Sequence, residues 1–214
     1  MLSAVLFDMD GVLVDTEELT FLAARQMFRE HGIRVTREDF RPFIGTGENS
    51  YIGNVARKYG FAVEIVRDKA RMYELFGLLA KGRLKTLPGV FDFIAICRKK
   101  GFKLAVATSA DHVKMMINLR ETGLDRVNFD GLIAGDKITH KKPHPEIYLK
   151  TAAELGVSPD HCLVIEDAVN GIEAARAAGM KCLAITNSFT REELSKADWI
   201  CDSLEQYPKE ALHW

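Results

Sequence analysis

Two carboxylates at the end of an apolar run are the feature of this sequence with the clearest chemical use. Asp8 and Asp10 follow the apolar residues 5–7 and precede Gly11. Like charges at this spacing repel one another unless a cation lies between them. Mg²⁺ binds carboxylate oxygens, and it can also neutralise an incoming phosphoryl group. The pair therefore indicates metal-assisted phosphoryl transfer, while a charged turn after a strand is the plain structural alternative.

Two further segments carry groups that suit the same chemistry. Thr108, Ser109 and Ala110 end another apolar run, where a hydroxyl and backbone N–H groups can bind phosphate oxygens. Lys142 precedes Pro143, whose ring fixes the backbone next to the lysine ammonium. Taken one at a time, these segments are also typical of a helix cap and of a solvated loop lysine.

A second acidic group, Glu166 and Asp167, ends a further apolar run. An aspartate in this position can also cap the following helix, so the pair alone leaves both interpretations open. The pair indicates a functional site only when it is considered together with the other three segments.

The alternation of apolar runs and amphipathic stretches predicts an α/β fold. Strands are expected at 3–8, 103–108, 131–134, 162–165, 181–185 and 199–201, and helices between them at 113–122, 146–155 and 169–178. This order predicts a doubly wound, Rossmann-like parallel sheet with helices on both faces. Because ligands bind beyond the carboxyl ends of such strands, Asp8, Thr108 and Asp167 are expected to meet there.

Residues 16–86 interrupt this alternation with helical patterns only. One apolar face is expected in the first helix, and further helices near 37–40, 50–59 and 65–81. We therefore predict an α/β catalytic core formed by residues 1–15 and 87–214, with a small all-helical cap domain at 16–86. A cap over the site suits a reaction that excludes water at one step.

Composition excludes several classes of function. The 29 basic and 30 acidic residues give a net charge of -1, which lacks the basic field of a nucleic-acid-binding protein. No apolar run approaches the roughly 20 residues of a membrane-spanning helix, and no export segment precedes Asp8. Cys97, Cys162, Cys182 and Cys201 form no CxxC pair, so we expect buried thiols in a reducing compartment. These features predict a cytoplasmic protein that binds neither nucleic acid nor membranes.

Taken together and in this order, the four segments resemble the motifs of the haloacid-dehalogenase-like superfamily of aspartate-dependent phosphotransferases. The resemblance is to its β-phosphoglucomutase-like subgroup in particular, and it extends over essentially the whole chain. It implies that Asp8 is a nucleophile that forms a phosphoaspartyl intermediate and that Asp10 is the general acid and base. Thr108, with the Ser109 and Ala110 amides, would bind the phosphoryl group.

The same resemblance implies Mg²⁺ as the cofactor. The metal would be bound by the Asp8 and Asp167 carboxylates, by the Asp10 backbone carbonyl and by Glu166, directly or through water. Lys142 would neutralise charge on the nucleophile and on the phosphate. Members that cleave carbon–halogen bonds need neither Mg²⁺ nor an acid two residues after the nucleophile, so these residues favour phosphate chemistry.

The cap residues bear on the kind of phosphate chemistry. Mutase members of the subgroup carry a histidine in the first cap helix and an arginine in the cap loop that contacts substrate. This chain has Thr20 where those members have the histidine. Its cap loop consists of Gly45, Thr46, Gly47, Glu48 and Asn49. A mutase must hold a second phosphate, which Glu48 would repel. Lys69 and Arg71, on a later cap helix, are more typical of solvated charges than of a replacement.

We therefore expect a Mg²⁺-dependent phosphatase for small phosphomonoesters such as sugar or polyol phosphates, which acts as a monomer on a phosphorylated metabolite. A phosphosugar mutase of the β-phosphoglucomutase type is the first alternative. A catalytically idle domain that binds phosphoryl groups for regulation is the second, and the complete set of motifs argues against it.

Overall fold

A six-stranded parallel sheet forms the centre of the structure, in the order β3-β2-β1-β4-β5-β6. The computed structural model describes residues 1–127 and 129–214. The strands are β1 Ala4–Phe7, β2 Lys103–Ala107, β3 Gly131–Ile133, β4 Cys162–Glu166, β5 Lys181–Ile185 and β6 Trp199–Cys201. The predicted doubly wound α/β class is confirmed, and each predicted strand is present with its ends shifted by no more than about one residue.

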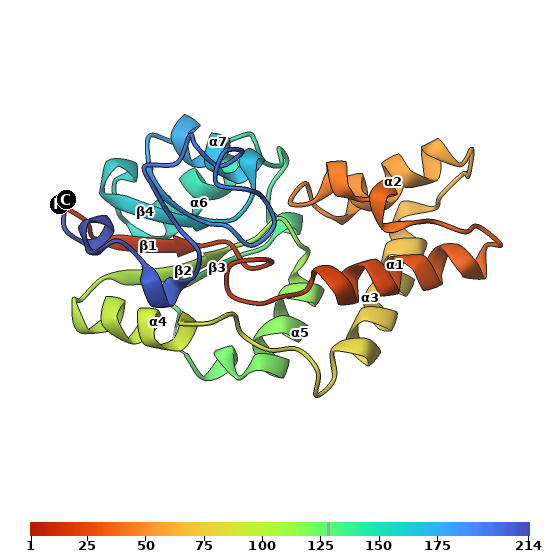
Figure 1. Ribbon diagram of the computed structural model, residues 1–214, viewed down its shortest axis with the longest axis horizontal. Coiled ribbons are helices and arrows are strands. Elements are labelled where there is room, and N and C mark those ends of the chain that lie inside the picture. The colour runs from red at the N-terminus through yellow and green to blue at the C-terminus, as the bar shows by residue number, and fades with distance from the viewer. Residues whose placement is uncertain (128) are drawn as a thin grey trace.

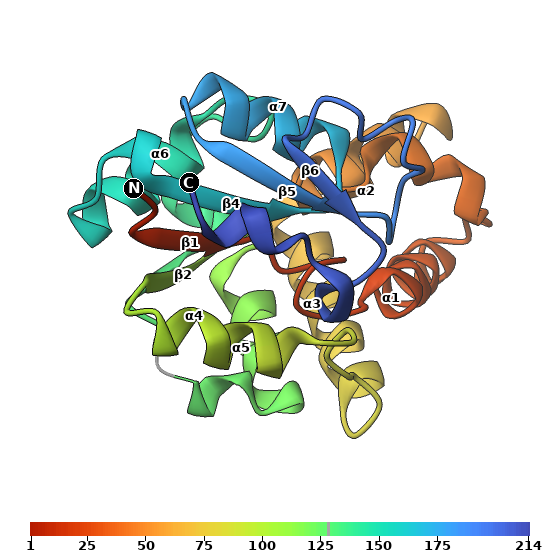
Figure 2. The ribbon, with the colours of Figure 1, turned by 60° about the vertical axis from the view of Figure 1, so that its left-hand side comes forward.

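Helices cover both faces of the sheet. Their bounds are Val90–Lys99 for α4, His112–Thr122 for α5, Glu146–Leu155 for α6 and Val169–Ala177 for α7. Helices α4 and α5 lie on one face, and α6 and α7 lie on the other (Figure 2). In β1, Val5 and Phe7 pack toward α4 and α5, while Ala4 and Leu6 pack toward α6 and α7. Since side chains alternate along a strand, an unbroken apolar run supplies both layers of the core.

The helical segment after β1 lies at one end of the molecule, beyond the carboxyl ends of the strands (Figure 1). Its helices are α1 Glu17–Glu30, α2 Glu48–Lys58 and α3 Ile65–Ala80. The prediction of a helix near 37–40 was wrong, because the chain there forms two short 3₁₀ turns, Arg37–Asp39 and Arg41–Phe43. The Asp39 carboxylate accepts the Thr36 N–H at 2.7 Å, and Pro42 has no N–H to continue a longer helix.

The chain passes into and out of this helical segment through two extended segments that lie side by side. Val14 and Thr86 form an antiparallel bridge, and the Leu87 N–H donates to the Leu13 carbonyl at 3.1 Å. We keep the division into a core of 1–15 and 87–214 and a cap of 16–86 as a proposal, with this paired crossing as its hinge.

The remaining sequence expectations concern burial. All four cysteines are buried in the described part of the chain, and desolvation raises the pKa of the Cys162 thiol to about 11. Such thiols are poor nucleophiles, which agrees with a packing role. Within residues 1–127 and 129–214, none of the helices combines the length and the apolar character needed to cross a membrane.

Phe93 in α4 offers a direct test of the core. Its ring lies edge-on to Phe7, with 6.0 Å between centroids, and is almost fully buried. We expect Phe93→Ala to lower the free energy of unfolding by about 3–5 kcal/mol, measured by chemical denaturation, because it leaves a cavity. The matched control is Phe91→Ala in the same helix, where the ring is 46% exposed and the loss should stay below about 1 kcal/mol. Equal losses of unfolding free energy in the two variants would contradict the burial of Phe93 in the core.

Candidate active site

The predicted residues converge at the carboxyl edge of the sheet. Strand β1 lies between β2 and β4, so the residues that follow these three strands are brought together. One pocket is lined there by all the predicted core residues, namely Asp8, Asp10, Thr108, Ser109, Ala110, Lys142, Glu166 and Asp167. From the predicted cap loop, Gly45, Gly47 and Glu48 also line it, whereas Thr46 and Asn49 are not among the described residues that do so.

Lys142 connects the two acidic segments. Its ammonium donates to Asp8 Oδ1 and to Glu166 Oε1, both at 2.6 Å, and it lies 4.9 Å from the centre of the Tyr148 ring. Burial disfavours the charged lysine, but the two carboxylates outweigh this effect and raise the pKa of Lys142. Lys142 is therefore a permanently charged partner of both acids.

Glu166 is fixed by four donors. Its Oε1 accepts from Lys142 and, at 2.8 Å, from the Tyr148 hydroxyl, while Oε2 accepts from the Asp167 and Ala168 amides at 2.9 Å each. Gly171 in α7 leaves room for this carboxylate, since an added Cβ would lie 1.7 Å from Oε1. Glu166 thus mainly orients Lys142 and has little capacity left for direct contact with a metal.

Asp8 and Asp167 remain as the carboxylates available to a metal. Together with Glu166 they offer oxygen atoms that lie within 4.8 Å of one another. Burial, reinforced by the neighbouring carboxylates, raises the pKa of Asp8 to about 7 and that of Asp167 well above its usual value. One lysine does not balance three carboxylates, so the donor set and its excess negative charge fit Mg²⁺.

Asp10 is held by a separate set of donors, from Thr16 before α1 and from α5. Its Oδ1 accepts from the Thr16 hydroxyl, from Asn118 Nδ2 at 3.3 Å and from Lys114 Nζ at 3.1 Å. The same Lys114 ammonium lies 3.1 Å from Oε1 of Glu48, which belongs to the cap loop. A single buried lysine therefore joins Asp10 in the core to the first residue of α2.

The turn after β2 is closely fixed. Thr108 Oγ1 accepts the Ala110 N–H at 3.1 Å, and Lys141 Nζ donates to the carbonyls of Ser109 and Gly135 at 3.3 and 2.6 Å. The Ala110 amide, predicted to bind phosphate, is thus bonded to Thr108 in this structure. The buried Ser109 hydroxyl has no hydrogen-bond partner among the described residues, and a hydroxyl can donate to an anion.

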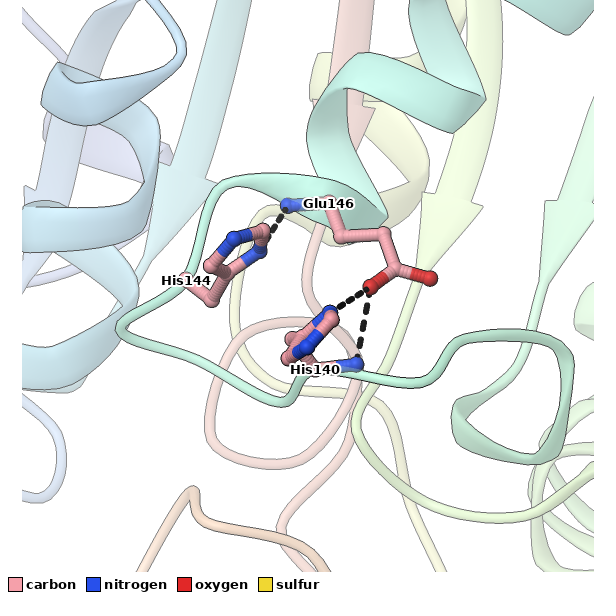
Figure 3. A group of neighbouring side chains, drawn as sticks. All are labelled: His140, His144 and Glu146. Atoms are coloured by element: carbon pink, nitrogen blue, oxygen red, sulfur yellow. Dashed lines mark hydrogen bonds and ion pairs between the residues drawn. The ribbon is translucent and has the colours of Figure 1, made fainter.

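A clasp of three side chains fixes the loop that carries Lys142 (Figure 3). Glu146 accepts the N–H groups of Thr139 and His140 and the Nδ1 of His140, all at 2.8 Å, and these backbone bonds lower its pKa to about 2. His144 Nδ1 accepts the Glu146 N–H at 3.2 Å. These bonds engage both carboxylate oxygens of Glu146 and the Nδ1 atoms of both histidines, and the cluster is exposed, so we interpret it as structural.

Sequence reasoning did not identify Lys114, Asn118, Tyr148 or Ser188. Lys114 and Asn118 are four residues apart and therefore share one face of α5, at the end near the Thr108 turn. Their spacing on one face of the helix that follows the Thr108 turn was the available signal. The Ser188 hydroxyl donates to Asp167 Oδ2, and its position after β5 is the only indication of it in the sequence.

The family described as haloacid dehalogenase-like hydrolase matches residues 5–185. The chain belongs to this family. The resemblance found in the motifs is confirmed, including the subgroup, because a β-phosphoglucomutase from Clostridium difficile superposes with a TM-score of 0.87 at 27% identity, covering 99% of this chain and 96% of that one.

Two curated relatives of this haloacid dehalogenase-like hydrolase differ in length. The phosphorylated carbohydrates phosphatase of Thermotoga maritima is 34% identical over 84% of this chain and 83% of its own. Protein SUPPRESSOR OF QUENCHING 1, chloroplastic, of Arabidopsis thaliana is 41% identical over 91% of this chain, which spans only 19% of that protein's length.

The buried charge of Asp8 gives a prediction for this hydrolase without metal. With a pKa near 7 when folded and 3.8 as the ordinary value, Asp8 binds a proton on folding, so its ionisation destabilises the fold as pH rises through this range. In chelator, Asp8→Asn should raise the free energy of unfolding by about 1–3 kcal/mol at pH 8, and this gain should disappear near pH 4. Exposed Asp125→Asn is the control, and a gain independent of pH would contradict the argument.

Gly171 gives a second prediction. Gly171→Ala should lower the free energy of unfolding by about 1–3 kcal/mol, because its methyl group would displace the Glu166 carboxylate. The matched control is Gly77→Ala in α3, whose Cβ would meet only Ile117 Cδ1, at 3.5 Å. That change should raise stability by about 0.5–1 kcal/mol, since alanine favours helix. Chemical denaturation measures the free energy of unfolding of both variants. Changes of the same sign in the two variants would contradict this explanation of Gly171.

Proposed function

We propose that this chain is a Mg²⁺-dependent phosphatase that hydrolyses small phosphomonoesters of sugars or polyols through a phosphoaspartyl intermediate. The observation that carries the proposal is the contact of Lys142 with both Asp8 and Glu166, beside Asp167. This contact supports the proposal, because a carboxylate oriented by a fixed positive charge and lying beside two further carboxylates suits nucleophilic attack on phosphorus assisted by a divalent cation. The phosphatase named among the relatives supports the same activity.

In the first step, an oxygen of Asp8 attacks phosphorus and the bond from phosphorus to the leaving oxygen breaks. Lys142 neutralises charge on the attacking carboxylate and on the phosphoryl group, which the Thr108 and Ser109 hydroxyls also bind. Asp10 donates a proton to the leaving oxygen, so an alcohol departs. When bound by Asp8 and Asp167, Mg²⁺ would supply further positive charge to the phosphoryl oxygens.

In the second step, water hydrolyses the phosphoaspartate. Asp10, now a carboxylate, takes a proton from the water that attacks phosphorus. The bond between phosphorus and the Asp8 oxygen breaks, inorganic phosphate leaves, and the Asp8 carboxylate is restored. Splitting the displacement in this way uses the same residues twice and leaves the chain unchanged.

The cap side of the pocket favours hydrolysis over a mutase reaction. Lys69 pairs with Asp111, and Arg71 pairs with Glu30 and Glu74. Neither basic residue is among the described residues that line the pocket, so neither replaces the missing arginine. We propose that the protein acts as a monomer on a small phosphorylated metabolite, since the residues of this mechanism all come from one chain.

Phosphate release tests the proposal. We expect release from a panel of sugar and polyol phosphates in Mg²⁺, loss of release in chelator, and a loss of roughly a thousandfold or more in Asp8→Asn because the nucleophile is gone. Exposed Asp125→Asn should keep full activity. Release that persists in Asp8→Asn would reject the mechanism. Interconversion of hexose 1- and 6-phosphates faster than phosphate release would favour the mutase.

A further inference from the structure

Lys114 is a buried cation of the pocket that the two steps above do not use. Its side chain is only 4% exposed, and its ammonium lies 3.1 Å from Asp10 Oδ1, 3.1 Å from Glu48 Oε1 and 5.4 Å from the centre of the Phe76 ring. Burial disfavours the charged lysine, but the two carboxylates outweigh this effect and raise the pKa of Lys114. Because a buried ion pair adds little stability compared with apolar packing, stability alone is a weak reason for this charge.

The contacts of the Asp10 carboxylate are concentrated on one of its two oxygens. Oδ1 accepts from the Thr16 hydroxyl, from Asn118 Nδ2 at 3.3 Å and from Lys114 Nζ. Oδ2 has no hydrogen-bond donor among residues 1–127 and 129–214, and it is not one of the buried atoms that lack a partner. Asp10 lines the pocket and its side chain is 29% exposed, so Oδ2 is the oxygen that remains open to a bound molecule.

The three donors on Oδ1 decide which oxygen of Asp10 can carry a proton. A carboxyl oxygen has two lone pairs, and Oδ1 already accepts from a hydroxyl, an amide and an ammonium. The proton that Asp10 transfers therefore belongs on Oδ2. Transfer requires a hydrogen-bond distance to the leaving oxygen, and a displacement of about 1 Å can cost roughly a hundredfold in rate. The orientation of Oδ2 depends on how firmly Oδ1 is held.

We propose that Lys114 is a positioning residue for proton transfer by Asp10. With Thr16 and Asn118 it fixes Oδ1, so that Oδ2 gives its proton to the leaving oxygen as the bond from phosphorus to that oxygen breaks. In the second step, Oδ2 takes a proton from the attacking water. Glu48 and Phe76 hold the ammonium from the cap side. This inference rests on the proposed phosphatase activity, and Lys114 acts in it only through Asp10.

Two substrates that differ in their need for a proton test this role. 4-Nitrobenzyl phosphate and 4-nitrophenyl phosphate are similar in size, but the first must release an alkoxide unless it is protonated, whereas the second releases a stable phenolate. The ratio kcat/KM covers the steps up to departure of the leaving group. In Lys114→Met we expect kcat/KM to fall about thirtyfold or more for the benzyl ester and less than about threefold for the phenyl ester. A merely structural role would lower both values alike.

Two further variants complete the kinetic test. Lys114→Met combined with Glu48→Gln removes one charge of each sign, which avoids an uncompensated buried carboxylate if the single variant does not fold. This double variant should change the ratio of the two esters in the same direction. Lys69→Met is the matched control, because it removes another lysine that pairs across cap and core, with Asp111, and does not contact Asp10. It should leave the ratio of the two esters unchanged.

A crystal structure of the Lys114→Met protein gives a second readout, which also decides the question if neither ester is a substrate. The Asp10 carboxylate should leave its position, while Asp8 keeps its contact with Lys142. Equal falls in kcat/KM for both esters, or an Asp10 carboxylate that keeps its position, would overturn the inference and leave the phosphatase proposal intact. No phosphate release by the unaltered protein from the panel of sugar and polyol phosphates would instead reject the proposed function.

Discussion

The concentration of buried negative charge at the carboxyl end of the sheet is the constraint on which the rest of the structure depends. Asp8 and Glu166 would repel each other without the ammonium of Lys142 between them, at 2.6 Å from each. The Tyr148 hydroxyl, two backbone amides and the small Gly171 hold Glu166 so that it can hold Lys142. The loop clasp and the close packing of α7 thereby keep Lys142 and Asp8 oriented toward each other.

A second lysine repeats this arrangement on the cap side. Lys114 lies between Asp10 and Glu48, just as Lys142 lies between Asp8 and Glu166. Each of the two lysines thus joins two carboxylates that line the pocket. Because Lys114 contacts both carboxylates, Asp10 and the first residue of α2 are held by the same side chain.

The fold was largely predictable from sequence, because each strand of a parallel sheet is an apolar run with both faces buried, as β1 illustrates. The core site was predictable because Asp8, Thr108 and Asp167 follow neighbouring strands. The roles of Lys114 and Tyr148 were not, since both depend on helix positions that only tertiary packing brings to the pocket. Likewise, Glu48 was expected only to repel a second phosphate, and its pairing with Lys114 depends on how the cap meets the core.

The most direct test of the account is to trap the covalent intermediate. The enzyme would be quenched during turnover of a sugar or polyol phosphate and treated with borohydride, which reduces an aspartyl phosphate to homoserine, and its peptides analysed by mass spectrometry. A phosphoaspartyl mechanism predicts homoserine at position 8, and at no other aspartate, when substrate and Mg²⁺ are present. Phosphate release with an unmodified Asp8 under the same conditions would contradict it.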